Sequence, residues 1–310
     1  MKKVLITGAG GMIGVNVIKH LLSDEKYEIT ALDFKNKKTH KFLNPYKRKI
    51  NVVYGDILDP SLVDSLVKET DYIIHLASCL PPIADYKKGL SEIIDYDGTN
   101  NIIRAINLYN PKCTLIYSST TSLYKKEGKV GKRISLEDNE YYNQSKFAAE
   151  NLIKEELKNY TILRVPLVLG DLRHDHFIYN IALKDKVEVI TKEDVSLSFV
   201  KALYNFKKIN RQILNIGGGT SCQDYFGNIL INILKCHGIS FHYIFSRIFL
   251  PKDYRTNILL DSEDSNKLLN YQNDTLTEYY NKQKRRSKLR KTQKFFAKIS
   301  IFFLKRRMTK

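Results

Sequence analysis

Residues 2–33 read KKVLITGAGGMIGVNVIKHLLSDEKYEITALD, an apolar run followed by three evenly spaced glycines. The run at residues 4–6 is typical of a strand that is buried on both faces. Gly8 permits a tight turn, Gly11 lets the backbone approach a pyrophosphate, and Gly14 lets a helix pack close to the sheet. The N-terminus of that helix presents free N–H groups and a positive dipole end. The stretch therefore predicts a strand, turn and helix that bind a dinucleotide.

An acid ends the next predicted strand. Residues 28–32 are strand-like and place Asp33 nineteen residues after the last of the three glycines, near the spacing at which an acid accepts hydrogen bonds from the adenosine ribose. This favours NAD over NADP, because Asp33 repels a 2′-phosphate, although Lys35, Lys37 and Lys38 weaken the preference. A glycine turn that only connects the strand to the helix is the alternative interpretation of the spacing G-x-x-G-x-x-G. The cofactor site is favoured because the strand, the helix and Asp33 all occur at the expected spacing around these glycines.

The net charge of +18 is concentrated at the C-terminal end. Residues 281–310 contain 13 Lys and Arg and no acid, so the first 280 residues carry 38 basic and 33 acidic side chains. Because the first 280 residues carry only a small excess of basic side chains, they require no polyanionic partner, and we expect no nucleic acid to bind them.

The four cysteines show neither C-x-x-C pairing nor metal-ligand spacing, which indicates a reduced setting. The first strand begins at residue 2, which leaves no room for a signal peptide, and no apolar run approaches the roughly 20 residues that span a bilayer. We therefore expect a cytoplasmic protein without a metal site.

Strand-like and helix-like segments alternate along the first half of the chain. Further strands are expected at 50–54, 72–76, 114–117 and 160–165, and helices at 61–69, 90–108 and 141–157. This alternation predicts an α/β fold, a Rossmann-type doubly wound parallel sheet with ligands at the carboxyl ends of the strands. We expect an NAD-binding domain over residues 1–170, a small substrate lobe over 171–280 that is interleaved with the last sheet strands, and a basic amphipathic helical tail over 281–310.

Tyr142 and Lys146 lie four residues apart at a predicted helix start, on one helix face. A phenol has a pKa of about 10, and an adjacent ammonium and a cationic nicotinamide favour phenolate, which makes Tyr142 usable as a general acid/base. Thr120, at the end of the fifth strand, is placed to hydrogen-bond the same substrate hydroxyl. Spacing excludes Tyr141. A chance Y-x-x-x-K is the alternative, but the order of motifs argues against it.

At this point the chain resembles the extended short-chain dehydrogenase/reductase family, the NAD-dependent epimerases and dehydratases that act on nucleotide sugars. The likeness covers residues 2–279. The segments that carry it, in chain order, are TGAGGMIG, GDILD, HLAS, YDGTNNIIRA, SSTTSLY, YYNQSK, LRVPLVLG, KEDVSLSFVKAL, LNIGGG and DSNKLLNYQNDTL.

The resemblance implies roles for particular residues. Tyr142, Lys146 and Thr120 would perform catalysis, with Lys146 also on the nicotinamide ribose, and Asp33 and Asp56 would hold the adenosine. The cofactor contacts expected along these motifs are Gly8, Gly11, Met12, Ile13, Gly14, Asp33, Asp56, Ile57, Ala77, Ser78 and Lys146. The candidate substrate contacts are Ser119, Thr121, Arg173 and Arg255. Family members commonly dimerise through a bundle that includes the Tyr142 helix, so a homodimer is expected.

One departure narrows the activity. Family dehydratases place Asp-Glu directly after the catalytic Thr, whereas Thr121 and Ser122 stand there in this chain. Sugar 4,6-dehydration is therefore disfavoured. The favoured function is an NAD-dependent nucleotide-sugar epimerase that works through a keto sugar. The alternatives are an NAD(P)H-dependent keto-sugar reductase of the same family and a non-catalytic NAD-binding scaffold at a membrane.

The tail alternates basic clusters with apolar residues between 295 and 304. This stretch is too short to span a bilayer but long enough for a helix that lies in the headgroup plane, where Lys and Arg are attracted to anionic lipid. We expect peripheral membrane attachment and a role in polysaccharide biosynthesis. The alternatives are a disordered basic extension, a helix that docks another protein and, as a minor option, RNA binding.

Overall fold

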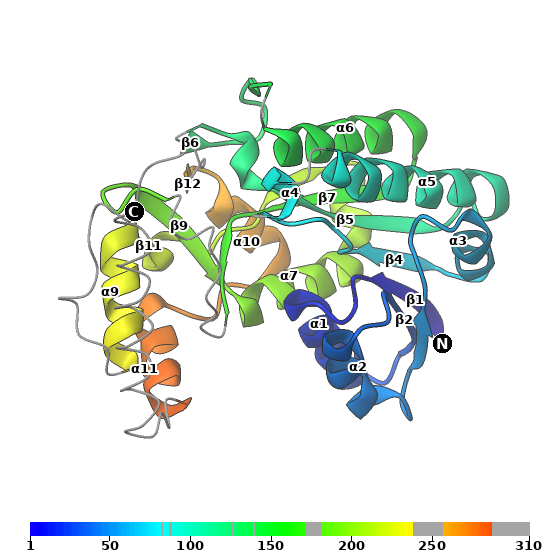
Figure 1. Cartoon of the computed structure of the whole chain (residues 1–310), viewed down its shortest axis with the longest axis horizontal. Coiled ribbons are helices and arrows are strands. Elements are labelled where there is room, and N and C mark those ends of the chain that lie inside the picture. Colours follow the sequence, from blue (N-terminus) through cyan, green and yellow to red (C-terminus); the bar gives the residue numbers. More distant parts are fainter. Residues whose placement is uncertain are drawn as a thin grey trace.

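The computed structural model describes residues 1–81, 83–86, 89–125, 127–138, 140–170, 181–237 and 257–286. Its centre is a seven-stranded sheet of order β10-β7-β5-β4-β1-β2-β3, in which all neighbouring strands are parallel (Figure 1). The strands of this sheet are β1 (Lys2–Thr7), β2 (Tyr27–Asp33), β3 (Asn51–Tyr54), β4 (Tyr72–His75), β5 (Thr114–Thr120), β7 (Tyr160–Val165) and β10 (Ile213–Asn215). The order reverses between β1 and β4, which is the point where a doubly wound sheet binds ligands.

Helices cover both faces of this sheet. The described helices of the whole chain, in both lobes, are α1 (Met12–Leu22), α2 (Lys37–Leu43), α3 (Pro60–Val67), α4 (Ile83–Tyr86), α5 (Gly98–Tyr109), α6 (Tyr141–Glu156), α7 (Lys192–Tyr204), α8 (Phe206–Ile209), α9 (Phe226–Cys236), α10 (Ser262–Leu269) and α11 (Leu276–Arg286). Short 3-10 turns are η1 (Asn44–Tyr46), η3 (Thr121–Leu123) and η5 (Thr220–Cys222), and η2 (Glu92–Asp97) is π-helical. The α/β architecture with a parallel central sheet confirms the predicted fold.

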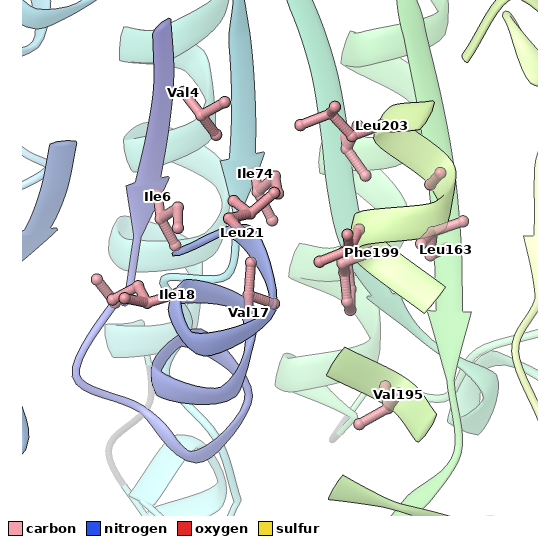
Figure 2. Close-up of a cluster of buried hydrophobic side chains, with 14 of the residues drawn as sticks. Val4, Ile6, Val17, Ile18, Leu21, Ile74, Leu163, Val195, Phe199 and Leu203 are labelled. Atoms are coloured by element: carbon pink, nitrogen blue, oxygen red, sulfur yellow. The ribbon is translucent and has the colours of Figure 1, made fainter. Parts of the chain in front are cut away.

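Alternation along the strands divides the core into two layers. Val4 and Ile6 of β1 pack with α1 and α7, where Phe199 is fully buried (Figure 2). Leu5, between them, points to the opposite face and packs with α3, α5 and α6. Because successive strand residues face opposite sides, a strand covered by helices on both faces is buried along its whole length and mostly apolar. All six residues of β7 are buried for the same reason.

The chain leaves the main sheet after β7 and builds a second lobe. Its strands are β8 (Leu167–Leu169), β9 (Lys186–Thr191) and β11 (Gln223–Tyr225), in the order β11-β9-β8, and β6 (Glu127–Gly128) pairs with β12 (Ile258–Leu259). Helices α9 and α11 pack against this sheet. Between β9 and β11 the chain returns to the main sheet as α7 and β10, so the two parts are interleaved in sequence.

The structure differs from two sequence expectations, and a third concerns residues outside the described ranges. The helix expected over 90–108 is divided into the π-helical η2 and the α-helical α5. The boundary expected at residue 280 falls inside α11, in which Gln283 is buried. Arg173, Arg255 and residues 287–310 lie outside the described residues, so their assignments stay predictions.

No described helix is long and apolar enough to cross a membrane. Within the same residues, no group of three or more His, Cys, Asp or Glu side chains is placed to hold a metal ion.

Candidate active site

The glycine turn after β1 is shaped for close approach. Gly8 has φ +66°, and a Cβ there would lie 2.7 Å from the backbone nitrogen of Ala77. A Cβ on Gly14 would lie 2.7 Å from the Cα of Ala9, so only glycine lets α1 pack this closely. Gly11 is the N-cap residue of α1 and has no side chain to occupy the first N–H groups of the helix. These N–H groups suit the anionic phosphates of a dinucleotide.

Asp33, at the carboxyl end of β2, faces this turn. Its Oδ2 accepts a hydrogen bond from the N–H of Gly10 at 2.8 Å, and its Oδ1 accepts one from the N–H of Phe34 at 2.7 Å. Burial raises the pKa of the Asp33 carboxyl, while the two backbone hydrogen bonds and Lys38 act in the opposite direction. The carboxylate is thereby fixed beside the glycine turn, where an adenosine ribose would lie.

The other predicted cofactor residues gather around the same edge of the sheet. Asp56 and Ile57 follow β3, and the Asp56 Oδ1 accepts from the N–H of Leu58 at 2.9 Å. The carbonyl of Ile13 accepts from the Ser196 hydroxyl at 3.2 Å. The Ser78 hydroxyl is buried without a hydrogen-bond partner in the described part of the chain, as expected of a group that binds a ligand. The residues present therefore fit a dinucleotide.

Met12 and Ala77 are placed by backbone contacts. A Cβ on Gly170, at the end of β8, would collide with the Met12 sulfur. The N–H of Ala77 donates to the Thr7 hydroxyl at 3.3 Å, which ties the ends of β1 and β4 together. Both residues thus border the glycine turn.

Lys146 lies one helical turn after Tyr142 on α6 and is buried, with 2% of its side chain exposed. Its Nζ donates to the carbonyl oxygen of Ser118 at 3.0 Å and lies 3.0 Å from the Oδ1 of Asp95. The ammonium also lies 4.9 Å from the centre of the Tyr117 ring. Lys146 is therefore held against the end of β5 by three neighbours.

Tyr142 is a weak acid in this setting. Burial raises the pKa of its phenol to about 12, and Asp95 and Tyr117 act in the same direction. The charge of Lys146 and a side-chain hydrogen bond with Thr120 lower it, but not enough to offset burial. The structure thus brings Tyr142, Lys146 and Thr120 together, with Tyr142 protonated at neutral pH.

Thr120 belongs to a polar chain that runs back to α6. Its hydroxyl accepts from the N–H of Ser122 at 3.1 Å and lies 2.8 Å from the Ser122 hydroxyl. Ser122 in turn donates to the Oδ1 of Asn143, the residue after Tyr142. This chain fixes the direction of the Thr120 hydroxyl relative to Tyr142.

The two described substrate candidates have buried positions. The Ser119 hydroxyl donates to Glu150 at 2.5 Å, and the carbonyl of Thr121 accepts from the Nδ2 of Asn257 at 2.7 Å. Both residues are 3% exposed. Their assignment to substrate stays a prediction.

His75 is a structural residue that links three elements. Its Nδ1 lies 2.6 Å from the Thr7 hydroxyl and its Nε2 lies 3.0 Å from the Thr99 hydroxyl, so the ring joins β1, β4 and α5. Burial lowers the pKa of His75 to about 3, with a further contribution from the charge of Lys146. The imidazole therefore stays neutral.

Asp95, Asn143 and Glu150 were missed by the sequence reasoning. Glu150 had a usable signal, because Tyr142, Lys146 and Glu150 recur every four residues on one helix face. Asp95 had none, since its contact with Lys146 joins segments 51 residues apart in the chain.

Comparisons with known proteins identify the family and the fold. Residues 4–205 match the model of a family described as the NAD dependent epimerase/dehydratase family. Among solved structures, Pal from Bacillus thuringiensis is 23% identical with a TM-score of 0.74, over 91% of this chain and 98% of that one. A UDP-glucuronic acid 4-epimerase from Bacillus cereus, in complex with UDP-glucuronic acid and NAD, is 21% identical with a TM-score of 0.73, over 91% and 99%. A dTDP-glucose 4,6-dehydratase from Bacillus anthracis, in complex with NAD, is 18% identical with a TM-score of 0.74, over 92% and 96%. At these identities the structural likeness establishes a shared fold.

Proposed function

The chain belongs to the NAD dependent epimerase/dehydratase family, and from this premise we propose that it is an NAD-dependent nucleotide-sugar epimerase. The observation that carries the proposal is the convergence of Tyr142, Lys146 and Thr120 at the carboxyl end of β5, on the sheet edge that holds the glycine turn. Parallel strands place all their carboxyl ends at one edge, so the acid/base group and the cofactor cradle share one site.

In the proposed reaction Tyr142 moves the proton and Thr120 orients the sugar. Tyr142 takes a proton from a ring hydroxyl as the carbon loses hydride, and it returns the proton after the keto sugar has turned over. Bound NAD supplies the hydride acceptor and donor. Thr120 hydrogen-bonds the reacting oxygen, and the Lys146 charge stabilises the phenolate form of Tyr142. No net oxidation results, so the cofactor is regenerated in each cycle.

The residues that would hold NAD are those of the cradle. The N–H groups at the start of α1 would meet the pyrophosphate, and Asp33 would accept from the adenosine ribose. Asp33 disfavours a 2′-phosphate, which supports NAD over NADP. The Bacillus cereus and Bacillus anthracis structures of the same fold are complexes with NAD.

Dehydration is not proposed, because its usual acid and base are missing. Thr121 and Ser122 occupy the two positions after Thr120. Neither can supply a carboxyl group, and Ser122 is engaged by Thr120 and Asn143.

A keto-sugar reductase is the second candidate, and a specific observation favours it. Asp95 lies against Lys146 and opposes its effect on Tyr142. A protonated Tyr142 is suited to give a proton to a carbonyl oxygen, which is the reductive direction. The reductase would consume external NADH or NADPH.

The cofactor content of the purified protein, with absorbance of reduced nicotinamide followed during addition of UDP- and dTDP-hexoses, separates these candidates. Retained NAD with conversion of the sugar and no net reduction supports the epimerase. An empty site that consumes NADH or NADPH with a keto sugar supports the reductase. If the protein binds no dinucleotide, both the epimerase and the reductase are rejected. A Tyr142→Phe protein with unchanged cellular function would favour a non-catalytic scaffold.

For the setting of the enzyme we propose a homodimer in the cytoplasm, attached peripherally to anionic membranes through its basic tail and active in polysaccharide biosynthesis. The sequence pattern of residues 281–310 supports the membrane attachment. The homodimer is supported by the resemblance to a family whose members commonly dimerise. Sedimentation of the full chain with and without anionic vesicles tests the dimer and the attachment together.

A further inference from the structure

A carboxylate and an ammonium meet in the interior beside Tyr142. Asp95 has no exposed side-chain surface and Lys146 is 2% exposed, and their charged atoms lie 3.0 Å apart. The second carboxylate oxygen of Asp95 accepts from the N–H of Cys79 at 3.3 Å. A buried ion is costly unless it is paired, so each of these charges depends on the other.

Asp95 reaches Lys146 from an irregular segment. It lies in the π-helical turn η2, which packs against α6. Single π-helical turns are rare and are concentrated at functional sites. The turn carries Asp95 inward, while Asp97 in the same turn is exposed.

We infer that Asp95 is a positioning residue whose carboxylate offsets the ammonium of Lys146 and so, together with burial, holds Tyr142 as a neutral phenol. This inference rests on the proposed function, since it concerns the same Tyr142. It adds that Tyr142 must release its own proton before it can take one from a ring hydroxyl.

The titratable groups that face Tyr142 and Lys146 come from three elements. Asp95 faces them from η2, Tyr117 from β5 and His75 from β4. The pKa of the Tyr117 phenol is raised by burial and that of the His75 imidazole is lowered, so both groups stay neutral near pH 7. Glu150, the next carboxylate along α6, is paired with Arg164. Asp95 is therefore the carboxylate that offsets Lys146.

The proton balance follows directly. When a keto sugar is reduced, its carbon receives hydride from a reduced nicotinamide and its oxygen receives the proton of Tyr142, which leaves Tyr142 as phenolate. When a hydroxyl is oxidised, Tyr142 must first lose its proton. The carboxylate of Asp95 opposes that loss, so it makes oxidation depend on higher pH than reduction does.

The test is a pH titration of the full-length, cofactor-free protein by NMR with tyrosine labelled at the ring carbon that bears oxygen. The Tyr142→Phe protein identifies the Tyr142 signal. In Asp95→Asn the titration midpoint should fall by about one to three pH units, because Lys146 then acts unopposed. Asp97→Asn removes the same charge from the same turn without touching Lys146 and should leave the midpoint in place. Equal midpoints in the two variants would overturn the inference.

Asp95→Asn leaves Lys146 buried without its partner and could fail to fold. The double variant Asp95→Asn with Lys146→Gln contains no such charge. If Asp95 neutralises Lys146, the double variant titrates within about half a pH unit of wild type; a midpoint higher by about one unit or more would show that the ammonium acts on Tyr142 unneutralised and would overturn the inference. Because the titration needs no sugar, it stands apart from the proposed function: a protein that turns over no nucleotide sugar but titrates as expected would reject the epimerase alone.

Discussion

Glu150 of α6 and Arg164 of β7 form a buried bidentate ion pair one helical turn beyond Lys146. The Nε of Arg164 donates to the Oε1 of Glu150 at 2.8 Å, and its second nitrogen donates to Oε2. Ser119 donates to the same Oε1, and Arg164 also donates to the Tyr124 hydroxyl at 2.6 Å. The pair therefore joins α6, β5 and β7 at the height of the active site.

Breaking this pair should be strongly destabilising. Arg164→Met leaves Glu150 buried without its partner, and we expect the free energy of unfolding to fall by about 3–5 kcal/mol in urea denaturation. Lys132→Met, which breaks the exposed pair with Glu127, is the matched control and should leave stability within error. Equal effects of the two variants would show that the Arg164 pair does not organise the core.

Tyr142→Phe should abolish turnover while the protein stays folded. Removing one hydroxyl deletes the proton donor and acceptor, so kcat should fall by about 10²–10⁴-fold with retention of bound dinucleotide. Tyr141→Phe is the control, because Tyr141 is one residue away on a different helix face and should keep its activity. Loss of activity in both variants would point to damage of α6 rather than to loss of the acid/base group.

Gly8→Ala should prevent dinucleotide binding. Gly8 has φ +66°, and the new Cβ would lie 2.7 Å from the backbone of Ala77, so the turn must distort. Gly131→Ala carries the same φ penalty, with φ +88°, but meets no atom within 4 Å. Calorimetric titration with NAD should detect binding to Gly131→Ala only; binding of equal strength by both would remove the turn from the cofactor site.

His75 should make the protein sensitive to acid. Its pKa is about 3 in the folded protein and 6.5 in the unfolded chain, so below pH 6.5 the unfolded chain binds the extra proton and stability is lost as pH falls toward 3. Between pH 7.5 and 5 this linkage amounts to about 2 kcal/mol.

The measurement is urea denaturation of wild type and of His75→Gln at these two pH values. Glutamine keeps hydrogen-bonding groups for Thr7 and Thr99 but does not titrate, so the pH-dependent loss should shrink by about 2 kcal/mol. His40→Gln alters an exposed histidine and should keep the wild-type slope. An unchanged slope in His75→Gln would mean that other groups cause the acid sensitivity.

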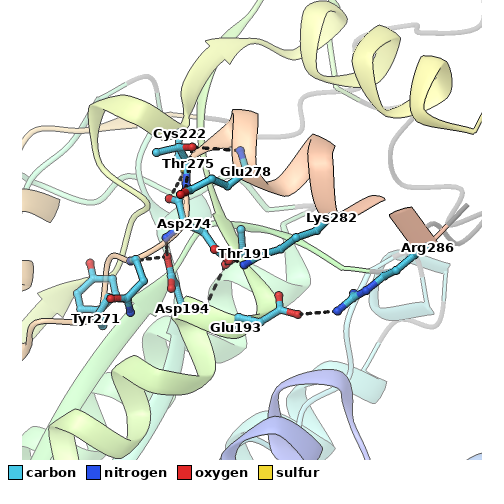
Figure 3. Close-up of polar contacts among 11 residues, drawn as sticks. Thr191, Glu193, Asp194, Cys222, Tyr271, Asp274, Thr275, Glu278, Lys282 and Arg286 are labelled. Atoms are coloured by element: carbon cyan, nitrogen blue, oxygen red, sulfur yellow. Dashed lines mark hydrogen bonds and ion pairs between the residues drawn. The ribbon is translucent and has the colours of Figure 1, made fainter. Parts of the chain in front are cut away.

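Removal of residues 287–310 should abolish binding to anionic vesicles without unfolding the protein. The cut belongs after Arg286, because α11 is anchored to the folded body: Lys282 pairs with Asp274, and Arg286 lies 3.6 Å from Glu193 (Figure 3). Asp274 is itself held, since its N–H donates to Asp194 at 2.9 Å.

Co-sedimentation with vesicles that contain about one-third anionic lipid measures the result, with neutral vesicles as the control for charge. The thermal midpoint should stay unchanged in the shortened protein. Equal sedimentation of the full and shortened chains would place any membrane contact elsewhere.

The sequence could predict contacts within one structural element, but not contacts between residues that lie far apart along the chain. The glycine turn, the acid at the end of β2, and the pairing of Tyr142 with Lys146 each follow from spacing within one turn, strand or helix. The alternation of strand-like and helix-like segments then sufficed to predict the parallel sheet, because strands covered by helices on both faces form nearly continuous apolar runs. The cap of α3 is likewise local: Asp59 accepts from the N–H groups of Ser61 and Leu62.

The tertiary structure decided the contacts between segments that lie far apart in the sequence. The sequence by itself determined the fold class and the spacing of the glycine turn, of Asp33 and of the Tyr142–Lys146 helix face, since that spacing is set by backbone periodicity. Only folding brought Asp95 to Lys146, turned Ser119 toward Glu150 and divided the helix expected over 90–108. The physical reason is that a buried charge must find its partner wherever packing places one, and no local pattern encodes that partner.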